Sequence, residues 1–378
     1  MSIGSPIRRP QRLRALAASA AAILVLATGA ASSQGSSPSS QTAPHRHGSR
    51  QPVALKGTPL GPTTGLRLLV ADVKPFVLDV DTGVETPVSG IDLPHGGVVS
   101  VVGTPGRAAF LIADPMLAGT GQRYARNWSV YAVPGGSTAA SPIGAGRYDA
   151  VPQASGPGIW VRQYVSRSHC RLQRIGLDGQ VSFQNAIPCN WTFTPGGSLG
   201  LVANRSRIVD PRTGRTVTLT VDGVLAAAGR RLLTARPYRT TILGTRLHLL
   251  DAATGAQRPV RWPSIVNQLD EPAVDPTGRW IAIGFGDPSW KFGPEQVLDV
   301  WVLDSRTGAL THVPGMPAFV HLKFTSMDWT ADGRLVLLGE DDERGFVAVW
   351  RPGQPQLAIR NVQLPQRTGG SDAFAIVR

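Results

Sequence analysis

The 378-residue chain has 38 basic and 25 acidic residues and a net charge of +13, but six of the basic residues precede residue 53. The rest of the chain therefore carries only +7, with arginines spread along its whole length and only four lysines. This distribution does not predict the clustered basic stripe of a nucleic-acid-binding protein, whereas an anionic partner such as a cell-wall polymer or a lipid surface stays open.

The first 31 residues have the pattern of a targeting segment. Four arginines lie between Arg8 and Arg14, an apolar stretch covers residues 15–27, and small residues follow through Ala31. This order is typical of a secretory signal peptide. The apolar stretch is shorter than the roughly 20 residues of a spanning helix, which favours cleavage over an uncleaved anchor. We therefore predict a signal peptide at 1–31 and a secreted or extracytoplasmic protein, which would touch a membrane only through an uncleaved N-terminal segment.

Residues 32–52 are rich in Ser, Gln, Pro and Gly and contain almost no large apolar side chain. Such a segment cannot bury enough surface to offset the entropy lost on ordering, so we expect a flexible tether. The folded part is then predicted to be a single domain over residues 53–378.

One turn phrase, D-x-x-T-G, recurs in this part of the chain. It occupies residues 79–83, 210–214, 251–255 and 304–308, and each copy lies between two short apolar runs. Asp and Thr side chains bond to nearby backbone and Gly supplies a positive φ, so the phrase predicts a turn between antiparallel strands. Weaker versions end at Gly136, Gly179 and Gly353. The seven turns are on average 45 residues apart, which is typical of propeller blades.

A second set of seven turns alternates with the first. Each opens an apolar run, and their glycines are Gly65, Gly106, Gly158, Gly197, Gly229, Gly278 and Gly333. Seven turns of each kind predict seven units of four strands, a to d, joined by an a–b turn, a b–c loop and a c–d turn. No run shows the 3.6-residue period of a helix. The sequence thus predicts an all-β, seven-bladed β-propeller, with six or eight blades as the alternatives because three c–d turns are degenerate.

The ring must be closed at its first unit. The run at 66–70 is strand b of that unit, and its inner strand could come from residues 373–377 at the far end of the chain or from residues 53–55. Sharing one blade between both ends of the chain removes a free sheet edge. We therefore favour closure by the C-terminal strand.

The turns D-P-T-G-R at 275–279 and T-A-D-G-R at 330–334, alternating with D-x-x-T-G, resemble those of TolB-like and WD-repeat-like propellers of bacterial exported proteins. The resemblance covers most of residues 53–378, although the Gly-His and Trp-Asp pairs of true WD repeats are absent. It implies a binding or scaffold role and carries no catalytic residue onto this chain.

Both cysteines flank the third c–d turn. An even number of cysteines in an exported protein predicts a disulfide. With a two-residue turn at Asp178 and Gly179, position 170 faces position 187, so Cys189 lies two residues beyond the position facing Cys170. At that offset, a small shift of the backbone would bring the two cysteines close enough to form a disulfide. We predict a structural disulfide between Cys170 and Cys189.

Loop length indicates where a ligand would bind. The b–c loops of blades 2, 5 and 6 are the longest, and in a propeller these loops emerge on one face together with the d–a connections. Long loops on a rigid scaffold often carry binding residues. The candidate binding residues are aromatic or basic: Arg123, Tyr124, Arg126, Tyr238, Arg239, Trp290 and Lys291, with Tyr164, Arg167 and His169 on blade 3. This mixture suits a protein partner or an anionic or glycan ligand.

The function expected from these features is an extracytoplasmic binding or scaffold propeller whose partner is a protein or a cell-envelope polymer. No cofactor, metal site or catalytic set is predicted. The G-x-S-x-G match at 196–200 lies between strands instead of in the strand–turn–helix of a hydrolase, so it predicts a turn.

The alternative is a secreted enzyme, a glycan lyase or hydrolase, that acts at the central channel. Glycoside hydrolysis requires a pair of carboxylates. Four carboxylates surround the long loop of blade 6: Asp270, Glu271, Asp287 and Asp299. Two of them would have to meet near the ring axis for this alternative to hold.

Overall fold

The computed structural model divides the chain into two units, Met1–Ser49 and Arg50–Arg378, and all described residues belong to the second. The described residues are 55–92, 97–104, 108–114, 129–145, 147–152, 158–166, 168–196, 200–204, 206–210, 213, 215–220, 222–236, 246–261, 268–269, 272–286, 296–316, 318–320, 327–341, 344–364 and 374–377. The predicted signal peptide and tether lie outside them. Within the described residues, no helix that could cross a bilayer is present.

The second unit consists of seven small sheets. Blade 1 contains β31 (Phe374–Val377), β2 (Arg67–Val70), β3 (Phe76–Asp79) and β4 (Glu85–Pro87); blade 2 contains β5 (Gly97–Gly103), β6 (Ala109–Asp114), β7 (Ser129–Val133) and β8 (Ser141–Ala145). Blade 3 contains β9 (Arg147–Pro152), β10 (Ile159–Tyr164), β11 (His169–Ile175) and β12 (Val181–Pro188); blade 4 contains β13 (Phe193–Pro195), β14 (Leu201–Ala203), β15 (Arg207–Val209) and β16 (Thr216–Leu219).

The remaining blades have the same plan with small additions. Blade 5 contains β17 (Gly223–Ala228), β18 (Arg231–Arg236), β19 (Arg246–Asp251) and β20 (Gln257–Val260). Blade 6 contains β21 (Gln268–Leu269), β22 (Ala273–Val274), β23 (Trp280–Gly286), β24 (Gln296–Asp304), β25 (Leu310–His312) and β26 (Ala318–Val320). Blade 7 contains β27 (Met327–Trp329), β28 (Leu335–Asp341), β29 (Arg344–Trp350), β30 (Leu357–Val362) and β1 (Gly57–Pro59).

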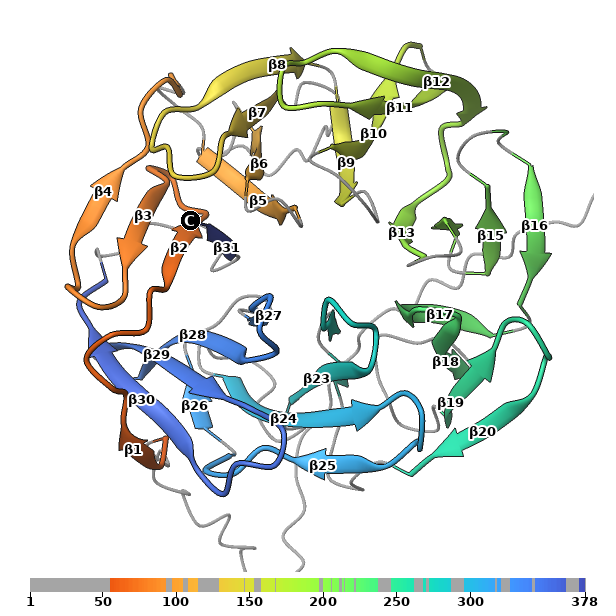
Figure 1. Ribbon diagram of the computed structural model, residues 1–378. Helices are drawn as coiled ribbons and strands as arrows, with labels where there is room; N and C mark the ends of the chain where they lie inside the picture. The colour runs from red at the N-terminus through yellow and green to blue at the C-terminus, as the bar shows by residue number, and fades with distance from the viewer. Residues whose placement is uncertain are drawn as a thin grey trace, which may run out of the picture. The chain divides into compact units, whose positions relative to one another are not determined.

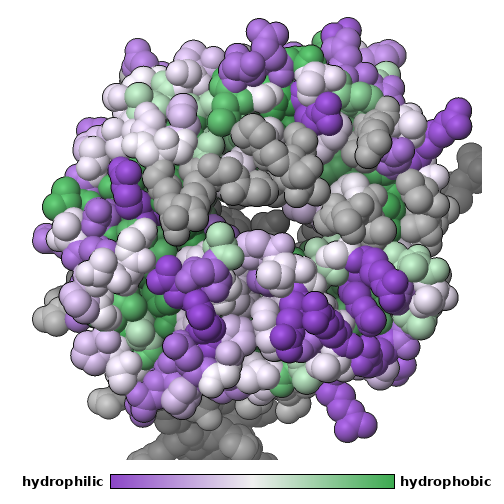
Figure 2. Space-filling view, viewed as in Figure 1, coloured by the Kyte–Doolittle hydropathy of each residue, from purple (hydrophilic) through white to green (hydrophobic). Residues whose placement is uncertain are grey.

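The seven sheets are arranged in a ring (Figure 1). The innermost strands contact one another in the order β31, β5, β9, β13, β17, β22 and β27, and β27 contacts β31 to complete the circle. The space-filling view shows a hollow near the centre of the ring (Figure 2). The predicted all-β, seven-bladed β-propeller is confirmed, and the described residues contain no helix.

The core lies between the blades. The buried apolar residues form seven clusters within the described part of the chain, one at each interface between neighbouring sheets. Successive side chains of a strand point to opposite faces, so Leu68 packs toward blade 7 while Leu69 packs toward blade 2. Because both faces of the middle strands are buried, these strands appear in the sequence as continuous apolar runs.

The D-x-x-T-G phrases form the expected c–d turns. In the first, Asp79 Oδ1 accepts hydrogen bonds from the backbone N–H groups of Asp81 and Thr82 and from the Thr82 hydroxyl. Gly83 then adopts φ +72°, a region that side chains with a Cβ rarely occupy. The same Asp contacts recur in blades 5 and 6, and the three weaker turns also end in a positive-φ glycine. Gly214 lies outside the described residues.

Both ends of the folded chain take part in closing the ring. The C-terminal strand β31 pairs antiparallel with β2 and is the inner strand of blade 1, as predicted. The N-terminal segment contributes a strand as well, but at residues 57–59, where β1 pairs in parallel with β30 at the outer edge of blade 7. Blade 1 therefore has no vacant inner position for the alternative donor at 53–55.

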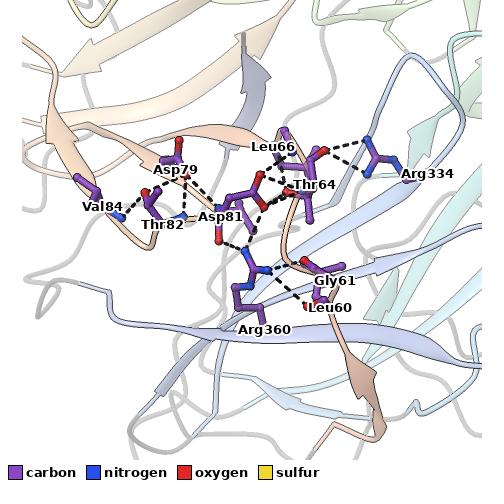
Figure 3. Close-up of polar contacts among 12 residues, drawn as sticks. Leu60, Gly61, Thr64, Leu66, Asp79, Asp81, Thr82, Val84, Arg334 and Arg360 are labelled. Carbon is purple, nitrogen blue, oxygen red and sulfur yellow. Dashed lines mark hydrogen bonds and ion pairs between the residues drawn. The ribbon is translucent and has the colours of Figure 1, made fainter.

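A polar cluster joins the N-terminal part of the folded chain to blades 1 and 7 (Figure 3). Asp81 accepts hydrogen bonds from the backbone and hydroxyl of Thr64 and from the backbone of Gly65, and it forms an ion pair with Arg360 of β30 at 3.1 Å. Arg360 also donates to the carbonyl oxygens of Val80 and Gly61. Burial alone would raise the pKa of Asp81, but these hydrogen bonds outweigh it and hold the pKa below its usual value. The cluster joins blade 1, blade 7 and the chain between β1 and β2.

Candidate binding face

The strand order places the b–c loops and the d–a connections at one end of every blade and the a–b and c–d turns at the other end. We call the first end the b–c face. The long b–c loops of blades 2, 5 and 6 fall outside the described residues. So do eight of the ten residues predicted for this face: Arg123, Tyr124, Arg126, Arg167, Tyr238, Arg239, Trp290 and Lys291.

The two other predicted residues lie at the b–c hairpin of blade 3. Tyr164 ends β10 and His169 begins β11, and Tyr164 is paired with Cys170 in the ladder. The backbone N–H groups of Val165 and Ser166 both donate to the His169 carbonyl at 3.0 Å. The exposed His169 ring has its Nδ1 atom 3.2 Å from the Ser166 hydroxyl and 2.9 Å from the Ser168 hydroxyl. Tyr164 packs partly against the apolar cluster between blades 3 and 4.

The predicted disulfide braces this hairpin. Cys170 faces Ile187 in the ladder, as the turn length indicated, and Cys170 is bonded to Cys189 with their Cα atoms 5.0 Å apart. The Cys170 side chain is buried at the interface between blades 3 and 4. The Arg162 guanidinium donates a hydrogen bond of 3.1 Å to the Cys189 carbonyl. The disulfide therefore fixes the start of strand c against the end of strand d on the b–c face.

An aromatic and basic pair that sequence reasoning missed lies beside the disulfide. Trp191 belongs to the d–a connection between blades 3 and 4, and the Arg207 guanidinium carbon lies 5.3 Å from its ring centroid. Trp191 also makes an edge contact with Phe193, with ring centroids 6.1 Å apart. This places Trp191 and Arg207 on the same end of the propeller as Tyr164 and His169.

Asn204 holds this connection in place. Its backbone φ is +49°, the only positive value among described non-glycine residues. Its side-chain oxygen accepts from the Thr192 N–H at 2.9 Å, and its own N–H donates to the Thr192 carbonyl at 2.8 Å. A signal for this arrangement was present in the sequence, because an asparagine between two strand runs favours a tight left-handed turn.

The carboxylate pair required by the enzymatic alternative is not seen among the described residues. Asp299 lies on β24, the third strand from the ring axis, where its Oδ2 atom accepts from Trp301 Nε1 at 2.9 Å. Its Oδ1 atom lies 2.6 Å from His312 Nε2. Asp270, Glu271 and Asp287 lie outside the described residues. Asp299 is thus engaged within its own blade and away from the channel.

Two further features bear on catalysis. No group of three or more His, Cys, Asp and Glu side chains that could hold a metal occurs in the described part of the chain. The G-x-S-x-G match spans the a–b turn between β13 and β14, where the Gly196 N–H donates to the Gly200 carbonyl at 2.8 Å. This is a strand–turn–strand, as predicted, although Ser198 itself lies outside the described residues.

Comparison with known proteins identifies the fold. No protein-family model and no curated protein matches the chain. A solved protein from Lactobacillus plantarum is similar, with 11% identity and a TM-score of 0.52 over 84% of this chain and 100% of that one. TolB from Acinetobacter baumannii has 11% identity and a TM-score of 0.48, over 83% of this chain and 67% of that one. A chain of the mitotic checkpoint complex has 14% identity and a TM-score of 0.48, over 86% and 100%. At such identities the likeness concerns the fold alone.

Proposed function

We propose that this protein is an extracytoplasmic binding or scaffold propeller that uses its b–c face for a protein or for an anionic or glycan ligand. The observation that carries the proposal is the braced hairpin of blade 3. There a disulfide and a set of backbone hydrogen bonds hold Tyr164 and His169 on the same end as Trp191 and Arg207. Binding sites need such support, because side chains held in place before contact lose less entropy on binding.

The chemistry of this face favours binding over catalysis. Aromatic and arginine side chains dominate the energetics of protein interfaces, and they also suit charged ligands. The disulfide supports placement in an oxidising compartment. Of the four carboxylates considered for the enzymatic alternative, Asp299 is the one that is described. Its side chain accepts a hydrogen bond from Trp301 and contacts His312.

The proposal is tested by retention of the purified full chain on the cell-envelope fraction of its source. Two variants are compared with the wild type: Tyr164→Ala with His169→Ala on blade 3, and Tyr124→Ala, Arg126→Ala, Trp290→Ala and Lys291→Ala in the long loops. We expect at least one of them to weaken retention by more than about tenfold, the loss of a single strong contact. Thermal melting controls for folding. If both variants fold and are retained as well as wild type, the proposal is wrong.

A further inference from the structure

The net charge of the folded part is not evenly distributed, although its arginines are. Residues 55–149 contain seven basic and seven acidic residues, and residues 222–378 contain 17 basic and 16 acidic residues. Residues 150–221 contain eight arginines and only two acidic residues. This segment, which forms most of blade 3 and all of blade 4, therefore carries +6 of the total of +7.

The two acidic residues of the segment lie at one end of the ring, whereas its arginines lie at both ends; Arg215, for example, closes the c–d turn of blade 4, where its carbonyl accepts from the Asp210 N–H. Both acidic residues of the segment, Asp178 and Asp210, lie in c–d turns, at the end of the ring opposite the b–c face. Arg171 is the second residue of β11 and Arg207 is the first residue of β15, so both lie near the b–c end of their strands. Arg171 and Arg207 thus place positive charge at the b–c end of blades 3 and 4, where Asp149 of β9 faces Arg162 in the ladder.

Elsewhere in the ring, several arginines form ion pairs. Arg279 pairs with Asp304 at 3.1 Å, and Arg334 pairs with Asp332 at 2.9 Å. Among the described residues, Arg171 and Arg207 form no such pair; Arg171 is exposed, and Arg207 contacts the Trp191 ring. Uncompensated surface charge raises the local concentration of oppositely charged partners and selects among them.

The geometry at Trp191 indicates which anion is favoured. A sugar or a nucleic-acid base would stack on an open aromatic face, but Arg207 lies over the Trp191 ring and Phe193 meets it edge-on. The group presented is therefore the guanidinium, which matches a carboxylate with two parallel hydrogen bonds. Arg, Trp and Tyr are also the residues most enriched at protein–protein hot spots.

We infer that the b–c end of blades 3 and 4 is a docking surface for an acidic segment, rich in Asp and Glu, of a partner protein. The inference rests on the proposed function and names the kind of partner. Arg171 and Arg207 supply the charge, Trp191 orients Arg207, and the disulfide and Asn204 keep the surface rigid.

The test measures binding of a fluorescent peptide of alternating Asp, Glu and Gly residues to the full chain by anisotropy. We expect Arg171→Glu with Arg207→Glu to weaken binding more than about tenfold. The matched control is Arg306→Glu, which reverses an exposed arginine in the c–d turn of blade 6, on the other end of the ring, and should leave binding unchanged. Raising the salt from about 0.1 M to about 1 M should weaken wild-type binding, because the Debye length falls from about 10 Å to about 3 Å.

Further variants and ligands keep the test decisive. Because Arg207 packs on Trp191, Arg171→Glu alone replaces the double variant if the latter melts at a lower temperature than wild type. Arg171→Lys with Arg207→Lys keeps the charge but loses the paired hydrogen bonds, so it should weaken binding less than the charge reversal does. No peptide binding, equal loss in the Arg306→Glu control, or insensitivity to salt overturns the inference. Tighter binding of a polyuronate, of a DNA oligonucleotide or of anionic vesicles than of the peptide also overturns it. If envelope retention persists in any of these cases, the proposed function stands and only the acidic-protein inference falls.

Discussion

Asp328 is a carboxylate at the seam where the ring closes. It lies on β27, the inner strand of blade 7, and accepts hydrogen bonds from the backbone N–H groups of Trp329 at 2.8 Å and of Ile376 in blade 1 at 3.2 Å. Burial raises its pKa to about 6, although these hydrogen bonds lower it in part. The folded state therefore holds the proton of Asp328 more tightly than the unfolded state does.

This proton linkage predicts how Asp328→Asn changes the pH dependence of stability. Asp328 contributes less to stability as pH rises from about 4 to about 8, because ionisation costs more in the folded state. Between these pH values, the free energy of unfolding of the variant should therefore rise by on the order of 2 kcal/mol relative to that of wild type. Urea unfolding at several pH values measures the difference, and a difference that does not change with pH would contradict the prediction. The pKa of Asp81 is lowered, so Asp81 stops stabilising the fold only at more acidic pH. The pH ranges in which Asp81 and Asp328 change the stability therefore differ.

Asp81 illustrates how one residue of a repeated turn acquires a separate role. The aspartate that builds each turn is the first of the phrase, as in Asp79. The third position is Ala253 in blade 5 and Arg306 in blade 6, so the turn does not require a carboxylate there. In blade 1 that position carries Asp81, which instead joins Thr64 and Arg360 (Figure 3).

Asp81→Ala should therefore leave the turn intact and weaken ring closure. Loss of several charge-assisted hydrogen bonds predicts a decrease of about 2 kcal/mol in the free energy of unfolding. Arg360→Ala should have a similar effect, and the double variant should cost less than the sum of the two because both single variants remove the Asp81–Arg360 ion pair. Strict additivity in a double-mutant cycle would argue against a shared cluster.

At the scale of elements, outer strands are attached to the c–d turn of the next blade. Arg258 of β20 donates to the backbone carbonyls of Thr307 and Arg306 in blade 6, as Arg360 of β30 donates to Val80 in blade 1. The Asn185 amide of β12 contacts the Thr213 carbonyl of blade 4 at 3.5 Å. These polar contacts supplement the apolar interfaces and keep neighbouring blades in register at their outer edges.

The blade 3 disulfide is expected to stabilise the hairpin locally and the chain globally. Cys170→Ala with Cys189→Ala removes a bridge that spans 19 residues, which on the chain-entropy estimate costs about 3 kcal/mol. Amide exchange should accelerate first at Val165, Ser166 and His169, whose bonds close the b–c hairpin. Equal protection of these amides in the variant and in wild type would show that the disulfide is not needed to order the hairpin.

The two terminal strands should differ in importance for the whole molecule. Phe374, Ala375 and Val377 of β31 belong to two interblade clusters, whereas β1 is exposed along its length at the edge of blade 7. Deleting residues 373–378 would leave β2 with an unpaired edge and two open cores, so we expect loss of cooperative folding. Deleting residues 1–59 should lower the melting temperature only modestly. Calorimetry of both truncations is the measurement, and comparable melting of the two would contradict this assignment.

The sequence by itself determined the blade plan. Glycines with positive φ in turns, and apolar runs between those turns, are local features of the sequence. They were enough to predict the seven c–d turns, the absence of helix in the described chain and the positions of the two bonded cysteines. The place of Tyr164 and His169 on the b–c face follows from the same strand order.

Only the tertiary structure decided which distant residues meet. Trp191 lies in the connection between β12 and β13, and Arg207 begins β15. Neither segment contains a local signal for its contact with the other. The joining of Asp81 to Arg360 and the pairing of β1 with blade 7 likewise depend on where the ring brings its ends together. Turn chemistry is encoded by neighbours in sequence, whereas these contacts depend on the angle and order of packed blades, which no short stretch of sequence contains.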